Sequence, residues 1–222
     1  PEPGDLAVVF DDNRRFVGIG LADPRSPIAI RMLHHGTSAT IDSAFFAQRI
    51  DDAVKLRQGL LGDSGTTGFR LVNGENDRLP GLIVDEYAGV LVVKLYTAGW
   101  IPHLDSILDH LVSIRAATAV VLRASRAVQA ALPEGEGAVV RGQLIDPVVR
   151  FQENGLSFLA DVVKGNKTGH FLDQRENRQR VRDRAGGRSM LDVFSSTGGF
   201  SVYAAAGGAS AITTVDISQG AL

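Results

Sequence analysis

The sequence predicts an α/β protein, more broadly a multi-domain α+β chain, because three kinds of hydrophobic pattern follow one another. Residues 4–37 alternate between apolar and polar side chains, as short strands do. Two later stretches, 42–61 and 101–114, carry apolar residues near helical spacing. Residues 190–216 have the pattern of a strand, a glycine turn, a helix and a second strand. A chain of 222 residues has room for one to three small domains of this kind.

The N-terminal stretch predicts three short strands with turns at Asp11-Asp12-Asn13 and Asp23-Pro24. The expected strands are Leu6–Phe10, Phe16–Leu21 and Ile28–Leu33. A helix over residues 42–61 then connects this module to the next, and Asp63-Ser64-Gly65 marks a break.

The middle of the chain predicts strands, one long helix and one short helix. The expected strands are Phe69–Val72, Leu82–Val84, Val90–Leu95 and Ala119–Leu122. The long helix covers residues 101–114, and the short one covers Ala124–Leu132 and ends at Pro133. Two further strands, Val148–Gln152 and Leu156–Val162, flank Asn154-Gly155, which is a strong hairpin signal. A charged helix over Leu172–Ala185 is expected to end at Gly186-Gly187.

The last pattern is the first half of a doubly wound nucleotide-binding unit, whose ligand lies across the carboxyl ends of the strands. A strand over Met190–Phe194 leads through a turn of small residues to a helix over Phe200–Ala206 and a strand over Ala211–Val215. Gly198 and Gly199 allow a ligand to approach the backbone closely. Asp216, at the end of the second strand, can accept hydrogen bonds from both hydroxyls of a ribose.

The glycine turn favours S-adenosylmethionine over NAD or an unrelated βαβ unit. Its sequence, S-S-T-G-G-F, lacks the third glycine of the G-x-G-x-x-G dinucleotide pattern. Asp192 would repel a pyrophosphate but suits a cationic or zwitterionic ligand. S-adenosylmethionine carries an amino group, a sulfonium and a ribose diol, which match Asp192 and Asp216. The alternative for Asp192 is a solvated acid at the end of a strand.

Four segments carry a resemblance to a known family. They are K-T-G-H-F-L-D-Q-R-E-N-R at 167–178, D-V-F-S-S-T-G-G-F-S at 192–201, N-G-E-N-D-R-L-P-G-L-I-V-D-E-Y at 73–87 and P-G-D-L-A-V-V-F at 3–10. Together they resemble the PUA-domain-containing class I methyltransferases that modify cytosine C5 in large-subunit (23S) ribosomal RNA. The resemblance covers nearly the whole chain.

This resemblance implies a partial PUA-like β-barrel at 1–40, a connecting helix at 41–66 and a middle α/β domain at 67–147. The start of a Rossmann-like class I methyltransferase sheet, at 148–222, would follow. On this plan the chain starts inside the PUA module and ends after the second catalytic strand, so the 222 residues alone are expected to be inactive. The expected partner is ribosomal RNA in the cytoplasm, with no metal and no membrane, and a homodimer is left open.

The resemblance also implies that the segment around 167–178 covers the bound cofactor. Phe171 would lie against the adenine, although a core aromatic is the alternative. His170 departs from the family pattern, which often has an aromatic residue there. The residues predicted to bind the cofactor are Phe171, Asp173, Gln174, Arg175, Asp192, Phe194, Ser195, Thr197, Gly198, Gly199, Phe200, Asp216 and Ile217.

RNA binding requires local basic patches, because the net charge of −2 gives no global attraction for a polyanion. Residues 164–188 form the strongly basic stretch of the chain. The residues predicted to contact RNA are Lys164, Lys167, Arg178 and Arg182. The alternative is a solvated helix with i, i+4 pairs such as Glu176 with Arg180.

Methylation of cytosine C5 needs a cysteine thiolate that adds to C6, and the chain has no cysteine. The favoured interpretation is that the nucleophile lies outside this sequence, so no catalytic residue is named. The alternatives are an N-methyltransferase acting on ribosomal RNA, and an RNA-binding or assembly module with an inactive or incomplete methyltransferase domain.

Overall fold

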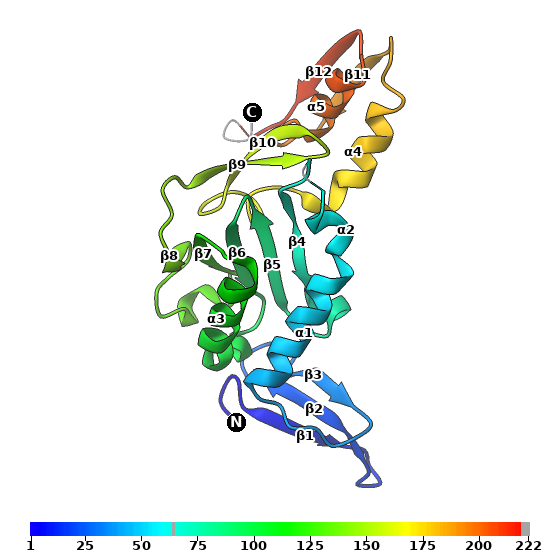
Figure 1. The fold of residues 1–222 in the computed structure, drawn as a ribbon. Coiled ribbons are helices and arrows are strands. Elements are labelled where there is room, and N and C mark those ends of the chain that lie inside the picture. The colour runs from blue at the N-terminus through cyan, green and yellow to red at the C-terminus, as the bar shows by residue number, and fades with distance from the viewer. Residues whose placement is uncertain (64, 219–222) are drawn as a thin grey trace.

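The computed structural model describes residues 1–63 and 65–218. Figure 1 shows an elongated molecule with a small N-terminal sheet at one end, a central sheet in the middle and a strand–helix–strand unit at the other end. The predicted mixed α/β class is confirmed.

The N-terminal sheet has three antiparallel strands in the order β1 (Leu6–Phe10), β2 (Phe16–Ala22) and β3 (Ile30–His35). The third strand begins two residues later than predicted, because Asp23 N donates a 2.8 Å hydrogen bond to Ala29 O and closes a turn there. In the described residues these strands form an open sheet, which agrees with part of a barrel.

The central sheet has the strand order β4 (Gly68–Asn73), β5 (Leu82–Tyr87), β6 (Val90–Leu95), β7 (Ala119–Ala124) and β8 (Ala138–Gly142). Only β6 and β7 run parallel among these neighbours, because α3 (Leu104–Arg115) crosses over between them. Strand β8 was not predicted.

The predicted helix over 124–132 is wrong. Strand β7 continues to Ala124, whose N–H donates a 2.7 Å bond to Glu136 Oε2, and the chain then makes only a 3₁₀ turn at Gln129–Ala131. Gly137 N donates to Leu122 O and starts the pairing with β8. Strand pairing therefore overrides the weak helical pattern of this alanine-rich segment.

Helix α1 (Ser43–Leu56) and helix α3 pack on one face of the central sheet (Figure 1). The carboxylate of Asp42 caps α1 by accepting a 2.9 Å bond from Phe45 N. A short helix, α2 (Gln58–Leu61), follows. Phe46 and Ile50 are buried in the central core, so α1 stabilises the sheet as well as joining it to the N-terminal strands.

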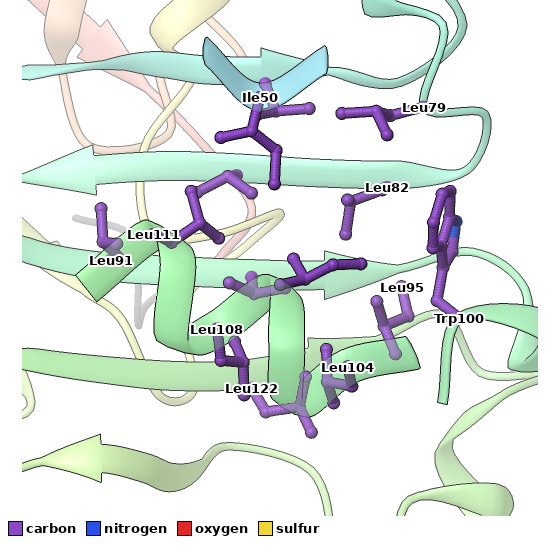
Figure 2. Packing of buried hydrophobic residues seen from close by; sticks show 14 of the residues in the cluster. Ile50, Leu79, Leu82, Leu91, Leu95, Trp100, Leu104, Leu108, Leu111 and Leu122 are labelled. Carbon is purple, nitrogen blue, oxygen red and sulfur yellow. The ribbon is translucent and has the colours of Figure 1, made fainter. Parts of the chain in front are cut away.

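Leucines from the sheet and from α3 pack together in this core, and Trp100 lies at one end of the cluster beside Leu82 and Leu95 (Figure 2). Trp100 is fully buried, and its Nε1 donates a 2.9 Å hydrogen bond to Pro80 O. Each buried leucine contributes about 1.5–3 kcal/mol through the hydrophobic effect. The central sheet is therefore the stable platform on which the C-terminal segments rest.

The loop after β4 has a structural role. Asp77 accepts hydrogen bonds of 3.1 and 2.8 Å from the Arg57 guanidinium and a 2.6 Å bond from Asn73 N. Arg57 also donates to Arg70 O on β4. This network fixes the C-terminal end of α1 to the edge of the sheet.

The C-terminal third contains the predicted hairpin and the predicted βαβ unit. Strands β9 (Val148–Glu153) and β10 (Leu156–Asp161) flank Asn154 and Gly155, whose φ angles of 51° and 77° fit a type I′ turn. Strands β11 (Ser189–Val193) and β12 (Ala211–Val215) are parallel and are joined by α5 (Gly199–Ala206).

The charged helix, α4 (Arg175–Arg182), is shorter than predicted. It follows a 3₁₀ turn at Leu172–Gln174. Beyond Arg182 the chain tightens into turns, because Arg184 N donates to Val181 O and Ala185 N donates to Arg182 O. No helix of the described residues is long and apolar enough to cross a membrane.

Candidate functional site

The turn between β11 and α5 has a backbone that alternates into the left-handed region. The φ angles of Phe194, Ser196 and Gly198 are 61°, 49° and 69°. Asp192 lies beneath this turn, where its Oδ2 accepts hydrogen bonds from Ser201 N at 3.2 Å and from Ser201 Oγ at 2.7 Å. Because Asp192 is buried, the solvated-acid alternative for this residue is wrong.

Asp216 fastens the end of β12 to the same turn. Its Oδ2 accepts a 2.8 Å bond from Ser196 N, and its Oδ1 accepts a 2.8 Å bond from Ser218 N. The amides of Ser218 and Ser196 hold the pKa of the Asp216 carboxyl below its usual value. Each carboxylate oxygen keeps a further lone pair that can accept from a ligand hydroxyl.

Two neighbouring cavities lie between this turn and residues 159–178. The first cavity has a volume of about 250 Å³ and is lined by His170, Phe171, Gln174, Arg178, Phe194, Ser195, Ser196, Thr197, Gly199 and Phe200. The second cavity has a volume of about 280 Å³ and is lined by Leu159, Asp161, Lys164, Gly165, Asn166, Gly169, Phe171, Ser196, Thr197 and Ser218. Phe171, Ser196 and Thr197 line both. An extended ligand can therefore occupy the two cavities together.

The structure brings most of the predicted cofactor residues to the first cavity: Phe171, Gln174, Phe194, Ser195, Thr197, Gly199 and Phe200. Asp192, Gly198 and Asp216 shape the turn from outside the lining. The remaining three, Asp173, Arg175 and Ile217, line neither cavity. Asp173 pairs with Lys167 at 3.3 Å, Arg175 pairs with Glu176 at 2.9 Å, and Ile217 is exposed.

The loop 166–171, which lines both cavities, is anchored to strand β5 of the central sheet. Thr168 Oγ1 donates a 2.5 Å bond to Asp85 Oδ2, and the Tyr87 hydroxyl accepts from His170 N at 3.1 Å. Arg70 donates bonds of 2.8 and 3.0 Å to the two oxygens of the fully buried Asp85. Burial raises the pKa of the Tyr87 phenol, which stays protonated. The central sheet thus sets the position of the cavity wall.

The prediction that Arg178 contacts RNA is wrong. Arg178 is only 2% exposed, and its Nε and Nη2 each donate a 2.8 Å bond to the buried carboxylate of Glu153. Its Nη1 donates to Phe171 O at 3.0 Å. A side chain at Gly199 would come within 3.1 Å of Arg178 Cδ, so this glycine allows the close packing. Arg178 therefore has a structural role: it lines the first cavity and fixes Phe171 and Glu153 around it.

The other basic residues remain on the surface. Lys164 lines the second cavity, and the Lys167 ammonium lies 4.3 Å from the centroid of the Phe171 ring. Arg182 is partly exposed. Among the described residues Glu176 pairs with Arg175 instead of Arg180, so the predicted i, i+4 pair is absent there. Phe171 is half-buried and lines both cavities, which distinguishes it from a core aromatic.

His170 is a site residue that the sequence left without a role. Its ring packs between Phe151 and Phe158, with centroid distances of 5.2 and 5.1 Å. Burial, and then the charge of Arg178, lower the pKa of its imidazole to about 4. The one signal in the sequence was its departure from the expected aromatic residue. In the described part of the chain, no group of three or more acidic, histidine or cysteine side chains could hold a metal ion.

Two family models match the chain. One, described as S-adenosylmethionine-dependent methyltransferase, matches residues 70–222, and one described as PUA-like domain matches residues 1–35. A "Ribosomal RNA large subunit methyltransferase" from Deinococcus radiodurans is 50% identical, and the match covers 100% of this chain and 56% of the relative. A "Ribosomal RNA large subunit methyltransferase I" from Shewanella frigidimarina is 40% identical over the same shares. The chain thus spans about half the length of these curated relatives.

Solved structures share the fold. One described as "A putative sam-dependent methyltransferase from Streptococcus mutans" superposes with a TM-score of 0.87 at 23% identity. The superposition covers 99% of this chain and 57% of that one. At this identity the likeness concerns the fold alone.

Proposed function

Because this chain belongs to the S-adenosylmethionine-dependent methyltransferase family, we propose that the whole protein transfers a methyl group from S-adenosylmethionine to large-subunit ribosomal RNA. The observation that carries the proposal is the 50% identity, over the entire chain, to a relative named as a ribosomal RNA large subunit methyltransferase. The proposed place of action is the cytoplasm, where ribosomal RNA would be modified, and a homodimer stays a prediction.

We assign the cofactor to the two cavities. Asp216 binds the amides of Ser196 and Ser218, both of which line the second cavity, so its carboxylate is suited to hold a ribose at that side. Phe171 then offers its ring to the adenine. The amino-acid end would extend toward Gly199 and the first cavity. S-adenosylmethionine supplies the activated methyl group, and the protein supplies alignment and exclusion of water.

The RNA-contacting role is proposed for Lys164, which lines the second cavity, for Lys167, which lies over the Phe171 ring, and for the partly exposed Arg182. The proposed acceptor is cytosine C5. The 222 residues contain no cysteine, so thiolate addition at C6 would draw its nucleophile from another part of the whole protein.

Incubation of the whole protein with methyl-labelled S-adenosylmethionine and large-subunit ribosomal RNA tests this function. Digestion of the RNA to nucleosides and mass spectrometry should identify 5-methylcytidine. A nucleoside methylated on nitrogen would overturn the C5 assignment and keep the methyltransferase. Absence of cofactor binding by the whole protein would overturn the proposal and favour an assembly module, and cofactor binding without transfer to any form of the RNA would overturn ribosomal RNA as the acceptor.

A further inference from the structure

Two buried polar side chains line the first cavity without a hydrogen-bond partner. His170 is 3% exposed and Ser195 is 6% exposed. Within residues 1–63 and 65–218, neither Nδ1 nor Nε2 of His170 has a partner, and neither does Ser195 Oγ. Buried polar atoms of native proteins are almost always paired, and an unpaired one costs stability. Both residues belong to the lining of the first cavity, where a polar group of a ligand can supply the missing partner.

The imidazole of His170 is neutral at neutral pH. The aromatic rings of Phe151 and Phe158 surround it, and the nearby Arg178 charge is already paired with Glu153. Burial among these rings, and then the positive charge of Arg178, lower the pKa of His170 to about 4. A neutral imidazole carries one N–H donor and one acceptor nitrogen. His170 can therefore donate a directional hydrogen bond without burying a positive charge.

The start of α5 adds donors to the same cavity. Gly198 begins the helix with a left-handed backbone and gives it no side-chain cap. The first N–H groups of a helix have no intrahelical acceptor, and the N-terminal end carries partial positive charge. Gly199 and Phe200 line the cavity, whereas the N–H of Ser201 is already bound by Asp192. The cavity thus offers donors and favours an anionic ligand group.

We propose that His170 and Ser195 recognise the amino-acid carboxylate of S-adenosylmethionine, together with the amides at the start of α5. The inference rests on the proposed function, because it assumes that this cofactor binds. It makes the two residues specificity determinants for the amino-acid end of the cofactor, as opposed to its nucleoside end.

Two probes separate these ends in a titration of the whole protein. S-adenosylhomocysteine has the amino-acid group, and 5′-methylthioadenosine lacks it. His170→Phe and Ser195→Ala should each lower the affinity for S-adenosylhomocysteine roughly 10- to 100-fold, the range for a hydrogen bond to a charged group. Both variants should bind 5′-methylthioadenosine with an affinity within about 2-fold of the wild-type value, a change well below the effect of one hydrogen bond. His170→Gln keeps a donor and should recover part of the affinity.

The matched control is His35→Phe, since His35 is an exposed histidine of β3 outside both cavities. It should change neither affinity. The melting temperature of unliganded His170→Phe should equal or exceed that of the wild type, because an apolar ring replaces unpaired nitrogens. A purely structural role would lower it.

Equal weakening of both probes by His170→Phe, or unchanged binding of S-adenosylhomocysteine in both variants, would overturn the inference and leave the proposed function intact. Failure of the wild-type protein to bind either probe would instead overturn the proposed function, and this inference with it.

Discussion

Arg178 on α4 and Glu153 on β9 form a bidentate ion pair with two hydrogen bonds of 2.8 Å, and both side chains are buried. The Tyr203 hydroxyl of α5 donates to the same carboxylate at 3.0 Å. One buried pair therefore joins the hairpin, the charged helix and the helix that follows the glycine turn. Because Arg178 Nη1 also holds Phe171 O, the pair sets one wall of the first cavity.

Removing either partner of this pair should strongly destabilise the protein. Arg178→Met leaves the Glu153 carboxylate buried without its counter-charge, which costs about 3–5 kcal/mol in comparable proteins. Urea unfolding should show this loss for Arg178→Met and for Glu153→Leu. The double variant should lose less than the sum of the single losses. Additive losses would mean that the two side chains are not energetically coupled.

Thr168→Val should loosen the loop that lines both cavities. The change removes the hydroxyl that donates to Asp85 and keeps the side-chain volume, so it should cost about 1–3 kcal/mol of unfolding free energy. Hydrogen exchange at residues 166–171 should accelerate more than exchange in the central sheet. Thr118→Val is a control at an exposed threonine. Equal exchange in wild type and Thr168→Val would show that Asp85 does not position the loop.

The pH dependence of stability should report the buried His170. Its folded pKa of about 4 lies below its unfolded value near 6.5, so the unfolded chain binds the extra proton first. The contribution of the neutral His170 to the unfolding free energy is fully present above about pH 6.5. It is lost as the pH falls toward 4, by up to ~3 kcal/mol. Arg178 lowers this pKa further and Asp173 opposes the shift.

His170→Phe should remove this component, so the wild type should lose more stability than the variant between pH 6.5 and 4. The difference between their unfolding free energies isolates His170 from the carboxylates that titrate in the same range, Asp173 among them. Parallel curves for the two proteins would mean that His170 is protonated or solvated in the folded state.

The salt dependence of RNA binding should identify the basic residues that touch phosphates. Lys164→Ala and Lys167→Ala should each reduce the slope of log affinity against log salt by about 0.7–0.9, the value for one lost phosphate contact. Lys55→Ala, on the exposed side of α1, should leave the slope unchanged. If Lys164→Ala and Lys167→Ala give the wild-type slope, these lysines face solvent and make no contact with RNA phosphates.

The sequence predicted elements wherever a local signal agreed with the tertiary structure. Asn154-Gly155 specified its hairpin because both residues adopt positive φ at little cost. The βαβ pattern at 189–215 was equally local. Strand β8 and the turn at 124–132 depend instead on pairing with β7. No local sequence signal predicts this pairing.

The site was predictable to the extent that its residues lie in one motif. Thr197 and Gly199 belong to the glycine turn and line the first cavity. Arg178 was misassigned because an arginine in a basic stretch looks exposed, and its partner Glu153 lies 25 residues away in the chain. The unpaired nitrogens of His170 could not be foreseen, since they follow from the packing of Phe151 and Phe158 around the ring.

The binding of S-adenosylmethionine to the whole protein, with and without Asp216, tests the central claim most directly. Asp216→Asn removes the charge of the carboxylate and half of its acceptor capacity while it keeps the shape of the side chain. Isothermal titration should show binding by the wild type and an affinity at least about 10-fold lower for Asp216→Asn, as expected for a lost charge-assisted hydrogen bond. Asp12→Asn, in the distant turn between β1 and β2, should bind as the wild type does. Wild-type affinity in Asp216→Asn, or no binding by the wild type, would contradict the assignment of this turn as the cofactor site.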